Sequence, residues 1–183
     1  MAEITILFAD IHGFTHFSEA LEPEELVAVL NQYLAAAADA ILSQEGTIDK
    51  FMGDSVMAWF NAPIPQADHL LRAIKAALAI RDASHHLSQN LPLEQQLHFG
   101  IGIHCGDALL GLIGNEQRIE YTALGDSVNT AKRIQENSSI DQILISAAAY
   151  NHVKQHVNVK PAASIIAKGK TEPIIVYEVI SLL

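Results

Sequence analysis

The sequence contains few cysteines, few basic residues and no long uninterrupted apolar run. Its single cysteine, Cys105, cannot form an intrachain disulfide, which is typical of a reducing compartment. No stretch reaches the roughly 20 apolar residues that a membrane-spanning helix needs, and the first residues lack the basic-then-apolar pattern of a secretory signal. We therefore expect a cytoplasmic domain without direct membrane contact, whose parent protein could still be attached to a membrane.

Positive charge is also scarce, since 11 Lys and Arg stand against 21 Asp and Glu, for a formal net charge of −10. This balance disfavours nucleic-acid binding, because the phosphate backbone requires a basic surface. Five of the eleven basic residues nevertheless lie in or beside the motifs described below, namely Lys50, Lys132, Arg133, Lys168 and Lys170. This grouping favours a small polyanion as ligand, and chance clustering on a solvated surface is the alternative.

What remains is a chain of 183 residues, 50% hydrophobic and 17% charged, with the size and composition of one globular domain over residues 1–183. The chain starts almost on its first predicted strand and stops just after its last predicted strand. We therefore expect an output domain that belongs to a longer regulatory protein.

Apolar periodicity predicts strands interleaved with two long helices and a third helix. Pro23 is placed to begin the first helix, which runs to about Leu42, and Asp68 to cap the second, which runs to about Leu87. Turn signals predict β-hairpins around Gly53-Asp54 and around Gly106-Asp107. The third helix is expected at Asp126–Asn137, and the strands at Glu3–Ala9, Thr47–Phe51, Ser55–Phe60, Leu97–Cys105, Ala108–Ile113, Ile143–Ile145, Val157–Val159 and Ile174–Ile180. This order fits an α+β fold, a ferredoxin-like β-α-β-β-α-β core with additional C-terminal strands and helices.

Two acidic motifs follow apolar, strand-like runs. Asp10 lies in the segment Leu7–Thr15 and Asp54 in the segment Asp49–Ala58. Adjacent strands would bring the two carboxylates together, where like charges are costly unless a cation joins them. Hard oxygen ligands of this kind suit Mg²⁺ or Mn²⁺. The alternative is that each Asp is an ordinary turn residue.

A third segment, Glu120–Arg133, reads Glu-Tyr-Thr-Ala-Leu-Gly-Asp-Ser-Val-Asn-Thr-Ala-Lys-Arg. In this order and spacing, the three motifs together resemble the catalytic domain of the class III nucleotidyl cyclases, which make cyclic AMP or cyclic GMP from the nucleoside triphosphate. The resemblance runs from Ile4 to Val179 and implies the nucleotidyl cyclase fold. It also implies an adenylate cyclase, a phosphorus–oxygen lyase that converts ATP to cyclic AMP and pyrophosphate.

The resemblance assigns metal and transition-state roles. Asp10, Asp54 and the carbonyl of Ile11 would hold two divalent cations, Mg²⁺ or Mn²⁺, for the ribose 3′-hydroxyl and the triphosphate. Asn129 and Arg133, four residues apart on one helix face, would orient the ribose and neutralise charge on the α-phosphoryl oxygens. A solvated helix face is the alternative for this pair.

Phosphate binding has candidates at both ends of the chain. Phe14 and Thr15 begin a predicted helix whose amide groups can cradle phosphate, although family members often carry Arg where this chain has His12. Near the C-terminus, Lys168 resembles the family's phosphate-binding lysine, with Lys170 as a substitute. A turn with two solvated lysines is the alternative for that segment.

Lys50 and Thr122 are the base-reading candidates. A lysine donor and a hydroxyl suit adenine, whose ring nitrogen accepts and whose amino group donates. Guanine would instead call for an acceptor, usually Glu, where Lys50 stands. Members with Thr at the second position form a subgroup that is often stimulated by bicarbonate, and this chain resembles that subgroup. The alternatives are an exposed hairpin lysine and an ordinary strand threonine.

In the family, active sites form at a dimer interface, with metal ligands from one subunit and base-reading and transition-state groups from the other. This chain carries both sets, so the resemblance implies a homodimer with two equivalent sites. A guanylate cyclase, or a catalytically degenerate module that senses a ligand or dimerises partners, remains the alternative. The Gly-Gly-Asp/Glu-Glu-Phe signature of diguanylate cyclases is absent. The nine histidines show no recognised zinc spacing, so we expect no zinc site.

Overall fold

The chain alternates strands and helices from its first residues. A computed structural model describes residues 1–19, 21–166 and 172–183. The N-terminal part contains β1 (Ala2–His12), α1 (Phe14–Ser18), α2 (Pro23–Ser43), β2 (Thr47–Met52), β3 (Ser55–Phe60) and α3 (His69–Ser88). A 3₁₀ turn at Leu93–Gln95 leads to β4 (His98–Asn115), β5 (Arg118–Leu124), α4 (Asp126–Glu136), β6 (Ile143–Ser146), α5 (Ala147–Val153), β7 (Val157–Pro161) and β8 (Val176–Leu182).

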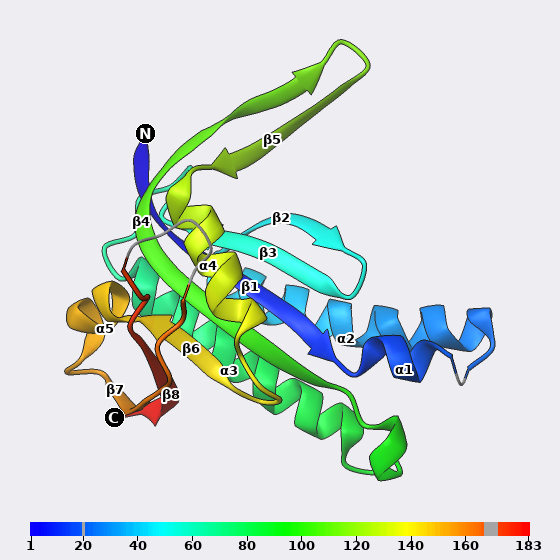
Figure 1. Cartoon of the computed structure of the whole chain (residues 1–183). Coiled ribbons are helices and arrows are strands. Elements are labelled where there is room, and N and C mark those ends of the chain that lie inside the picture. The colour runs from blue at the N-terminus through cyan, green and yellow to red at the C-terminus, as the bar shows by residue number, and fades with distance from the viewer. Residues whose placement is uncertain (20, 167–171) are drawn as a thin grey trace.

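One eight-stranded sheet organises these elements, in the order β2-β3-β1-β4-β6-β8-β7, with β5 paired to β4 (Figure 1). Strand β1 lies between β3 and β4 and is antiparallel to both. The strands β1 to β4, with α2 and α3 between them, form the predicted β-α-β-β-α-β core, which is confirmed. Strands β6, β8 and β7 extend the sheet beyond β4.

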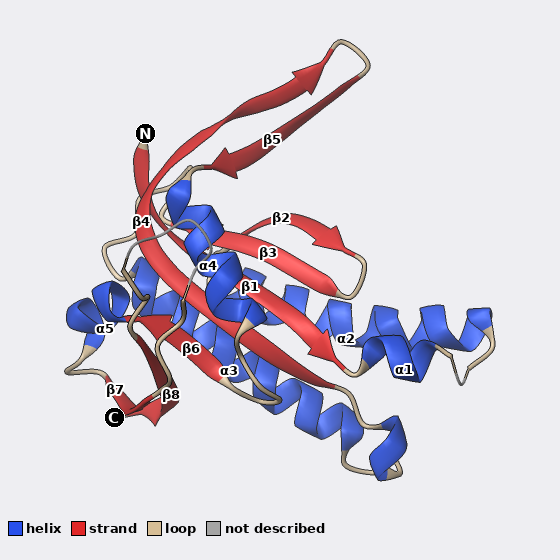
Figure 2. Ribbon diagram, in the orientation of Figure 1, coloured by secondary structure: helices blue, strands red, loops and turns tan. Residues whose placement is uncertain are grey.

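Helices cover both faces of the sheet (Figure 2). On one face, α2 and α3 lie over an apolar cluster that includes Tyr33 and Ile74. On the other face, α4 lies over a smaller cluster that includes Ile6 and Trp59. The hydrophobic burial of these clusters, which contributes about 25 cal/mol per Å² of apolar surface, holds the helices that carry the candidate site.

A glycine lets α4 lie directly on the sheet. A Cβ atom at Gly102 of β4 would lie 2.2 Å from the backbone nitrogen of Gln135 and 2.8 Å from the carbonyl oxygen of Ala131. Real Cβ atoms do not approach other atoms this closely, so any side chain at this position would push α4 away. Gly102 therefore sets the height of α4, and with it the position of Asn129 and Arg133.

The predicted hairpin around Gly106-Asp107 is wrong, because β4 runs through this point without a turn. Gly106 continues the antiparallel pairing of β4 with Ile4 of β1. A Cβ atom at Gly106 would lie 2.6 Å from Ser127 Oγ of α4. The glycine at this position therefore makes room for a helix and does not form a turn.

The true turn lies between β4 and β5. The side-chain oxygen of Asn115 accepts hydrogen bonds from the backbone amides of Gln117 and Arg118, both at 3.0 Å. The two strands form a long arm that reaches beyond the rest of the sheet (Figure 1). Exposed apolar side chains lie along this arm, at Leu109, Leu112, Ile119, Tyr121 and Leu124.

Helix α2 corrects the expectation that no segment has the length and apolar composition of a membrane span. Its length and apolar composition would suffice to cross a membrane, and 22% of its most apolar 18-residue stretch is buried. The core helix of a soluble protein can have the same length and composition. In this fold, α2 packs against α3 and places Tyr33, Ala37 and Ile41 in the core.

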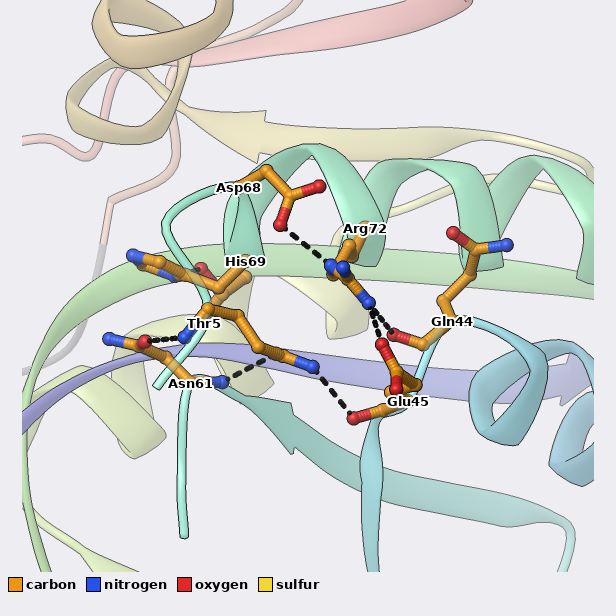
Figure 3. A network of polar contacts seen from close by, with 8 residues as sticks. Thr5, Gln44, Glu45, Asn61, Asp68, His69 and Arg72 are labelled. Atoms are coloured by element: carbon orange, nitrogen blue, oxygen red, sulfur yellow. Dashed lines mark hydrogen bonds and ion pairs between the residues drawn. The ribbon is translucent and has the colours of Figure 1, made fainter. Parts of the chain in front are cut away.

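Asp68 occupies the N-cap position of α3 as predicted, but its side chain makes no capping hydrogen bond. Its carboxylate instead accepts a hydrogen bond from Arg72 Nε at 2.6 Å. The same guanidinium group also pairs with Glu45, which follows α2 (Figure 3). Asp68 therefore helps to join the start of α3 to the end of α2.

Candidate active site

The two acidic motifs meet beside the central strand. Asp10 lies near the end of β1, and Asp54 lies in the turn between β2 and β3. Because β1 pairs with β3, Asp10 lies opposite Ser55, the residue next to Asp54. The amide of Ile11 donates to the carbonyl of Asp54 at 3.2 Å, and a side-chain hydrogen bond joins Asp10 to Asp54. The structure thus brings the three predicted metal ligands together.

The environment of Asp10 is unfavourable for its negative charge. Burial and the charge of Asp54 raise its pKa from 3.8 to about 6, although Lys132 partly offsets the shift. The charge of Lys132 does not cancel these effects, and Glu136 adds another negative charge near Asp10. A divalent cation fits here, since oxygen donors in this arrangement are its preferred ligands and its charge would favour ionised Asp10.

We expect Asp10→Asn to raise the thermal midpoint of the metal-free protein at neutral pH. The folded-state pKa of Asp10 lies above its ordinary value, so the folded protein holds the proton more tightly than the unfolded chain. The contribution of protonated Asp10 to the stability of the folded protein is therefore lost as the pH rises from 3.8 to about 6. The Asn side chain is neutral at every pH and avoids this loss. Thermal unfolding in the presence of a chelator measures the effect.

The matched control is Asp39→Asn, because Asp39 is an exposed carboxylate on α2. This variant should keep the wild-type midpoint. Adding Mn²⁺ should raise the midpoint of the wild-type protein, and by less as the pH falls below about 6, because protonated Asp10 cannot bind the ion. A lower neutral-pH midpoint for metal-free Asp10→Asn would contradict the inferred repulsion.

The two base-reading candidates lie together in a hollow, called the base-reading hollow below. Lys50 of β2 and Thr122 of β5 line a hollow of about 420 Å³, together with Asn129 of α4. Lys50 Nζ donates to Glu120 Oε2 at 2.8 Å. Thr122 Oγ1 donates to Asp49 Oδ2 at 2.8 Å, and the Asp49 side chain is only 1% exposed. Each candidate is therefore held by a neighbouring carboxylate.

These contacts affect the charges in the hollow. The hydrogen bond to Glu120 raises the pKa of Lys50, so this side chain keeps its positive charge. Burial raises the pKa of Asp49, while Thr122 and Lys50 act in the opposite direction. The hollow thus offers one charged donor and one hydroxyl whose proton is already engaged.

Helix α4 carries the predicted transition-state pair on one face. Asn129 and Arg133 both line another shallow hollow, distinct from the base-reading one, together with Lys132 and Glu136. Asn129 is exposed and Arg133 is half-buried. Lys132 Nζ lies 5.5 Å from the centre of the Phe8 ring on β1, below the helix. The spacing of four residues predicted this shared face.

The phosphate candidates are only partly described. Phe14 and Thr15 begin α1 after Gly13, which has a φ of 76° and makes no side-chain cap. The first amide groups of a helix have no partner within the helix. Lys168 and Lys170 lie outside the described residues.

Three residues near the site were not predicted as individual site residues, although all belong to the motifs. Asp49 precedes Lys50 directly, and Glu120 lies two residues before Thr122, on the same face of a strand. Lys132 lies next to Arg133 and lowers the pKa of Asp10. The period of two in β5 could have indicated Glu120, but the contact of Asp49 with Thr122 depends on how β2 meets β5.

The described lining of the base-reading hollow includes neither Asp10 nor Asp54. One protomer therefore presents two groups of predicted residues that do not line one common hollow, although Lys132 of α4 lines the base-reading hollow and acts on Asp10. One group can bind cations, and the other can bind a flat ring and a ribose. A nucleoside triphosphate would need both.

Known proteins share this chain's sequence pattern. A family model described as the adenylate and guanylate cyclase catalytic domain matches residues 1–180. Adenylate cyclase 1 of Rhizobium meliloti (strain 1021) is 36% identical over 188 residues, which cover 98% of this chain and 28% of that protein. The terminal-differentiation specific adenylate cyclase of Dictyostelium discoideum is 35% identical, over 97% of this chain and 8% of that protein. The chain thus spans less than a third of the length of both relatives.

Solved structures share the fold. The adenylyl cyclase CyaB from P. aeruginosa aligns with a TM-score of 0.91 at 33% identity, over 98% of this chain and 94% of that chain. The guanylyl cyclase Cya2 aligns with a TM-score of 0.93 at 37% identity, over 99% and 93%. Since these two proteins are named for different nucleotides, overall likeness does not decide which base this chain would bind.

Proposed function

The chain belongs to the family of adenylate and guanylate cyclase catalytic domains, and on that premise we propose that it converts ATP to 3′,5′-cyclic AMP and pyrophosphate. The ribose 3′-oxygen forms a bond to the α-phosphorus, and the bond from this phosphorus to the departing pyrophosphate breaks. The hydroxyl proton passes to solvent. The observation that carries the proposal is the hollow in which Lys50 and Thr122 lie beside Asn129.

Asp10, Asp54 and the Ile11 carbonyl are the residues that would hold two divalent cations, Mg²⁺ or Mn²⁺. When bound, such ions lower the pKa of the 3′-hydroxyl and neutralise charge on the phosphates. The proximity of the two carboxylates and the raised pKa of Asp10 support this assignment.

The remaining groups act on the ribose and the phosphates. Arg133 neutralises charge that develops on the α-phosphoryl oxygens, and Asn129 orients the ribose. Preorganised donors at developing charge commonly contribute a large part of an enzyme's rate acceleration. The amides of Phe14 and Thr15, together with Lys168, receive the outer phosphates.

Both groups of residues act at a homodimer interface, each site taking its carboxylates from one protomer and its α4 and base-reading groups from the other. The absence of Asp10 and Asp54 from the lining of the base-reading hollow supports this arrangement. The exposed apolar side chains on the β4–β5 arm also support it, since Leu112 is 73% exposed and Ile119 is 59% exposed. Apolar surface of this kind marks an interaction site on a protein.

The hydrogen bond from Thr122 to Asp49 favours adenine. A hydroxyl has one proton, and Thr122 donates it to Asp49. Toward a ligand, the Thr122 oxygen can then only accept. It can receive the amino group of adenine, whereas the carbonyl oxygen of guanine would meet another acceptor without a proton between them. Lys50 supplies the donor for the adenine ring nitrogen.

A guanylate cyclase is the second candidate, and Glu120 is the observation that favours it. Its carboxylate lies in the same hollow and could accept the ring N–H of guanine. Glu120 is engaged by Lys50 and also by Arg118, whose guanidinium lies 2.6 Å away. Because Lys50 and Arg118 already occupy this carboxylate, Glu120 is less free to accept a hydrogen bond from a base than the Thr122 oxygen is.

Chromatography of the products formed from ATP and from GTP, with Mg²⁺ or Mn²⁺, tests the proposed function. We expect cyclic AMP as the main product. The same assay with and without bicarbonate tests whether this ion stimulates the enzyme. Predominant cyclic GMP would select the second candidate, and no product from either nucleotide would indicate a degenerate module.

We expect Asp49→Asn to lower the ratio of kcat/KM for ATP to that for GTP by about tenfold, the value of one typical hydrogen bond. The Asn amide can donate to Thr122, which releases the hydroxyl proton toward the ligand and accommodates a carbonyl oxygen. Steady-state kinetics with both nucleotides measure this ratio. The matched control is Asp82→Asn on α3, whose side chain is 76% exposed, and it should keep the wild-type ratio. An unchanged ratio in Asp49→Asn would contradict the positioning role of Asp49.

A further inference from the structure

A second group of potential metal ligands lies far from the candidate active site. Glu3 of β1, His69 at the start of α3 and Cys105 of β4 each offer one ligand atom, and these three atoms all lie within 4.8 Å of one another. The distance between His69 Nε2 and Glu3 Oε1 is 3.7 Å. Ligand atoms on one tetrahedral zinc ion lie roughly 3.3–3.8 Å apart, given bonds of about 2.0–2.3 Å.

A threonine holds the histidine and the cysteine in the arrangement that a metal requires. Thr5 Oγ1 lies 2.6 Å from His69 Nδ1 (Figure 3) and also makes a hydrogen bond with the Cys105 side chain. If Nδ1–H donates to Thr5, Nε2 keeps its lone pair and lies 3.7 Å from Glu3 Oε1. The Thr5 hydroxyl proton can then be donated to the Cys105 sulfur. Outer hydrogen bonds of this kind typically fix the tautomer of a metal-bound histidine.

The charges of this group favour a cation. Burial raises the pKa of the Cys105 thiol, the hydrogen bond with Thr5 acts in the opposite direction, and the negative charges of Glu3 and Asp107 raise the pKa further. Burial also lowers the pKa of His69, which leaves its imidazole neutral and able to bind a metal at neutral pH. A bound dication would stabilise the thiolate that these neighbours otherwise disfavour.

The group opens into a cavity of about 230 Å³ that has room for a further ligand. His152 and His156, at the C-terminal end of α5 and just beyond it, line the same cavity as Glu3, His69 and Cys105. The charge of His152 contributes to the lowered pKa of His69, so the two rings are near one another. The fourth position of a tetrahedral site therefore faces an imidazole or water.

We propose that Glu3, His69 and Cys105 form a zinc-class metal site that joins β1, α3 and β4, with its fourth position open to the cavity below α5. On binding, the sulfur–hydrogen bond of Cys105 breaks, a sulfur–zinc bond forms from the same electron pair, and the proton passes to solvent. Thiolate and imidazole ligands select zinc-like ions over Mg²⁺. The site is thus chemically distinct from the Asp10–Asp54 pair.

This proposal departs from the expectation of no zinc site, which was based on sequence spacing. Sequence spacing gave no signal because the three ligands come from three elements that lie far apart along the chain. The described residues contain one other such group, His85, His98 and Asp141. There, the Asp141 carboxylate already contacts both rings, at 2.8 Å and 3.1 Å. It lacks a thiol and provides a control.

Cobalt is the probe that tests the site. Co²⁺ is titrated into the full chain in excess Mg²⁺, which occupies the Asp10–Asp54 pair. We expect one Co²⁺ per chain, with thiolate-to-cobalt charge-transfer absorption and the visible bands of tetrahedral cobalt, both abolished by Zn²⁺. Because Cys105 is the only cysteine, the charge-transfer band reports on this residue alone.

The variants separate this site from others. Cys105→Ser should remove the charge-transfer band, and Glu3→Gln, at an exposed side chain, should weaken Co²⁺ binding at least about tenfold. Thr5→Val should weaken it about 10–100-fold, because it removes the outer hydrogen bond. The control His98→Gln should bind Co²⁺ as the wild type does. Absence of the band in the wild type, or an unchanged affinity in Glu3→Gln together with Thr5→Val, would overturn the proposal.

Discussion

A mixture of Asp54→Ala and Arg133→Ala proteins should regain about a quarter of the wild-type rate of cyclic nucleotide formation, although each protein alone is inactive. Random pairing makes about half of the dimers mixed, and each mixed dimer contains one intact site out of two. In that site, the Arg133→Ala protomer supplies both carboxylates and the Asp54→Ala protomer supplies Arg133. The other site of the same dimer lacks both groups.

The two single variants should fail for different reasons. Arg133→Ala removes a donor to developing negative charge, which typically lowers kcat about 10²–10³-fold. Asp54→Ala leaves Asp10 without its carboxylate neighbour, so the site loses one of its proposed metal ligands. Its dependence on Mn²⁺ concentration should therefore change, whereas that of Arg133→Ala should not. Initial rates over a Mn²⁺ series measure this difference.

The matched control for mixing pairs two variants in the same group of residues, Asp10→Ala and Asp54→Ala. Every site in that mixture lacks at least one carboxylate, so no activity should return. Differently tagged copies show by co-purification that mixed dimers form. If the mixture of Asp54→Ala and Arg133→Ala forms mixed dimers and stays inactive, the shared site is wrong.

Lys50→Glu should lower kcat/KM for ATP more than about 100-fold without producing a guanylate cyclase, because a site built to pair with a base loses its donor. Lys50 Nζ lies 2.8 Å from Glu120 Oε2 and 3.8 Å from Asp49 Oδ2. The substitution places a third carboxylate beside these two. Like charges at this range repel, so the group favours protonation or displacement over base recognition.

The paired exchange of Lys50→Glu with Glu120→Lys should partly repair this repulsion. It restores one positive charge and presents the new carboxylate from β2, where guanine requires an acceptor. We expect kcat/KM for GTP at least about tenfold above that of the single variant, since one restored charged contact has that value. Product chromatography with both nucleotides measures the outcome.

The control for the charge change is Lys154→Glu, at an exposed lysine that follows α5. It should leave both nucleotide activities unchanged. Retention of near-wild-type ATP turnover in Lys50→Glu would show that Lys50 does not contact the base. A gain of GTP turnover in the single variant would show that Glu120 and Asp49 do not oppose a third carboxylate.

Local pattern predicted most of the core. Helix α2, which begins at Pro23, and helix α3, which ends at Ser88, follow from apolar spacing. The hairpin of β2 and β3 follows from its turn at Gly53 and Asp54. These features depend on contacts between near neighbours in the chain. Their period is therefore visible in the sequence without knowledge of the fold.

The prediction failed where a distant partner decides the conformation. Gly106 has the local character of a turn residue, but its pairing with Ile4 and the approach of Ser127 keep β4 extended. The contacts of Lys50 with Glu120 and of Thr122 with Asp49 span 70 and 73 residues. No local period reports such contacts.

The sequence by itself determined the family, the alternating core and the choice of Asp10 and Asp54 as the paired acids. Each of these leaves a motif or a period in neighbouring residues. Only the tertiary structure decided that Glu120 holds Lys50 and that Asp49 holds Thr122. It also decided that Gly102 lets α4 lie on the sheet and that Glu3, His69 and Cys105 lie close together. The physical reason is strand register and helix packing. These set distances between residues that the chain places far apart, and they depend on the burial of the whole core.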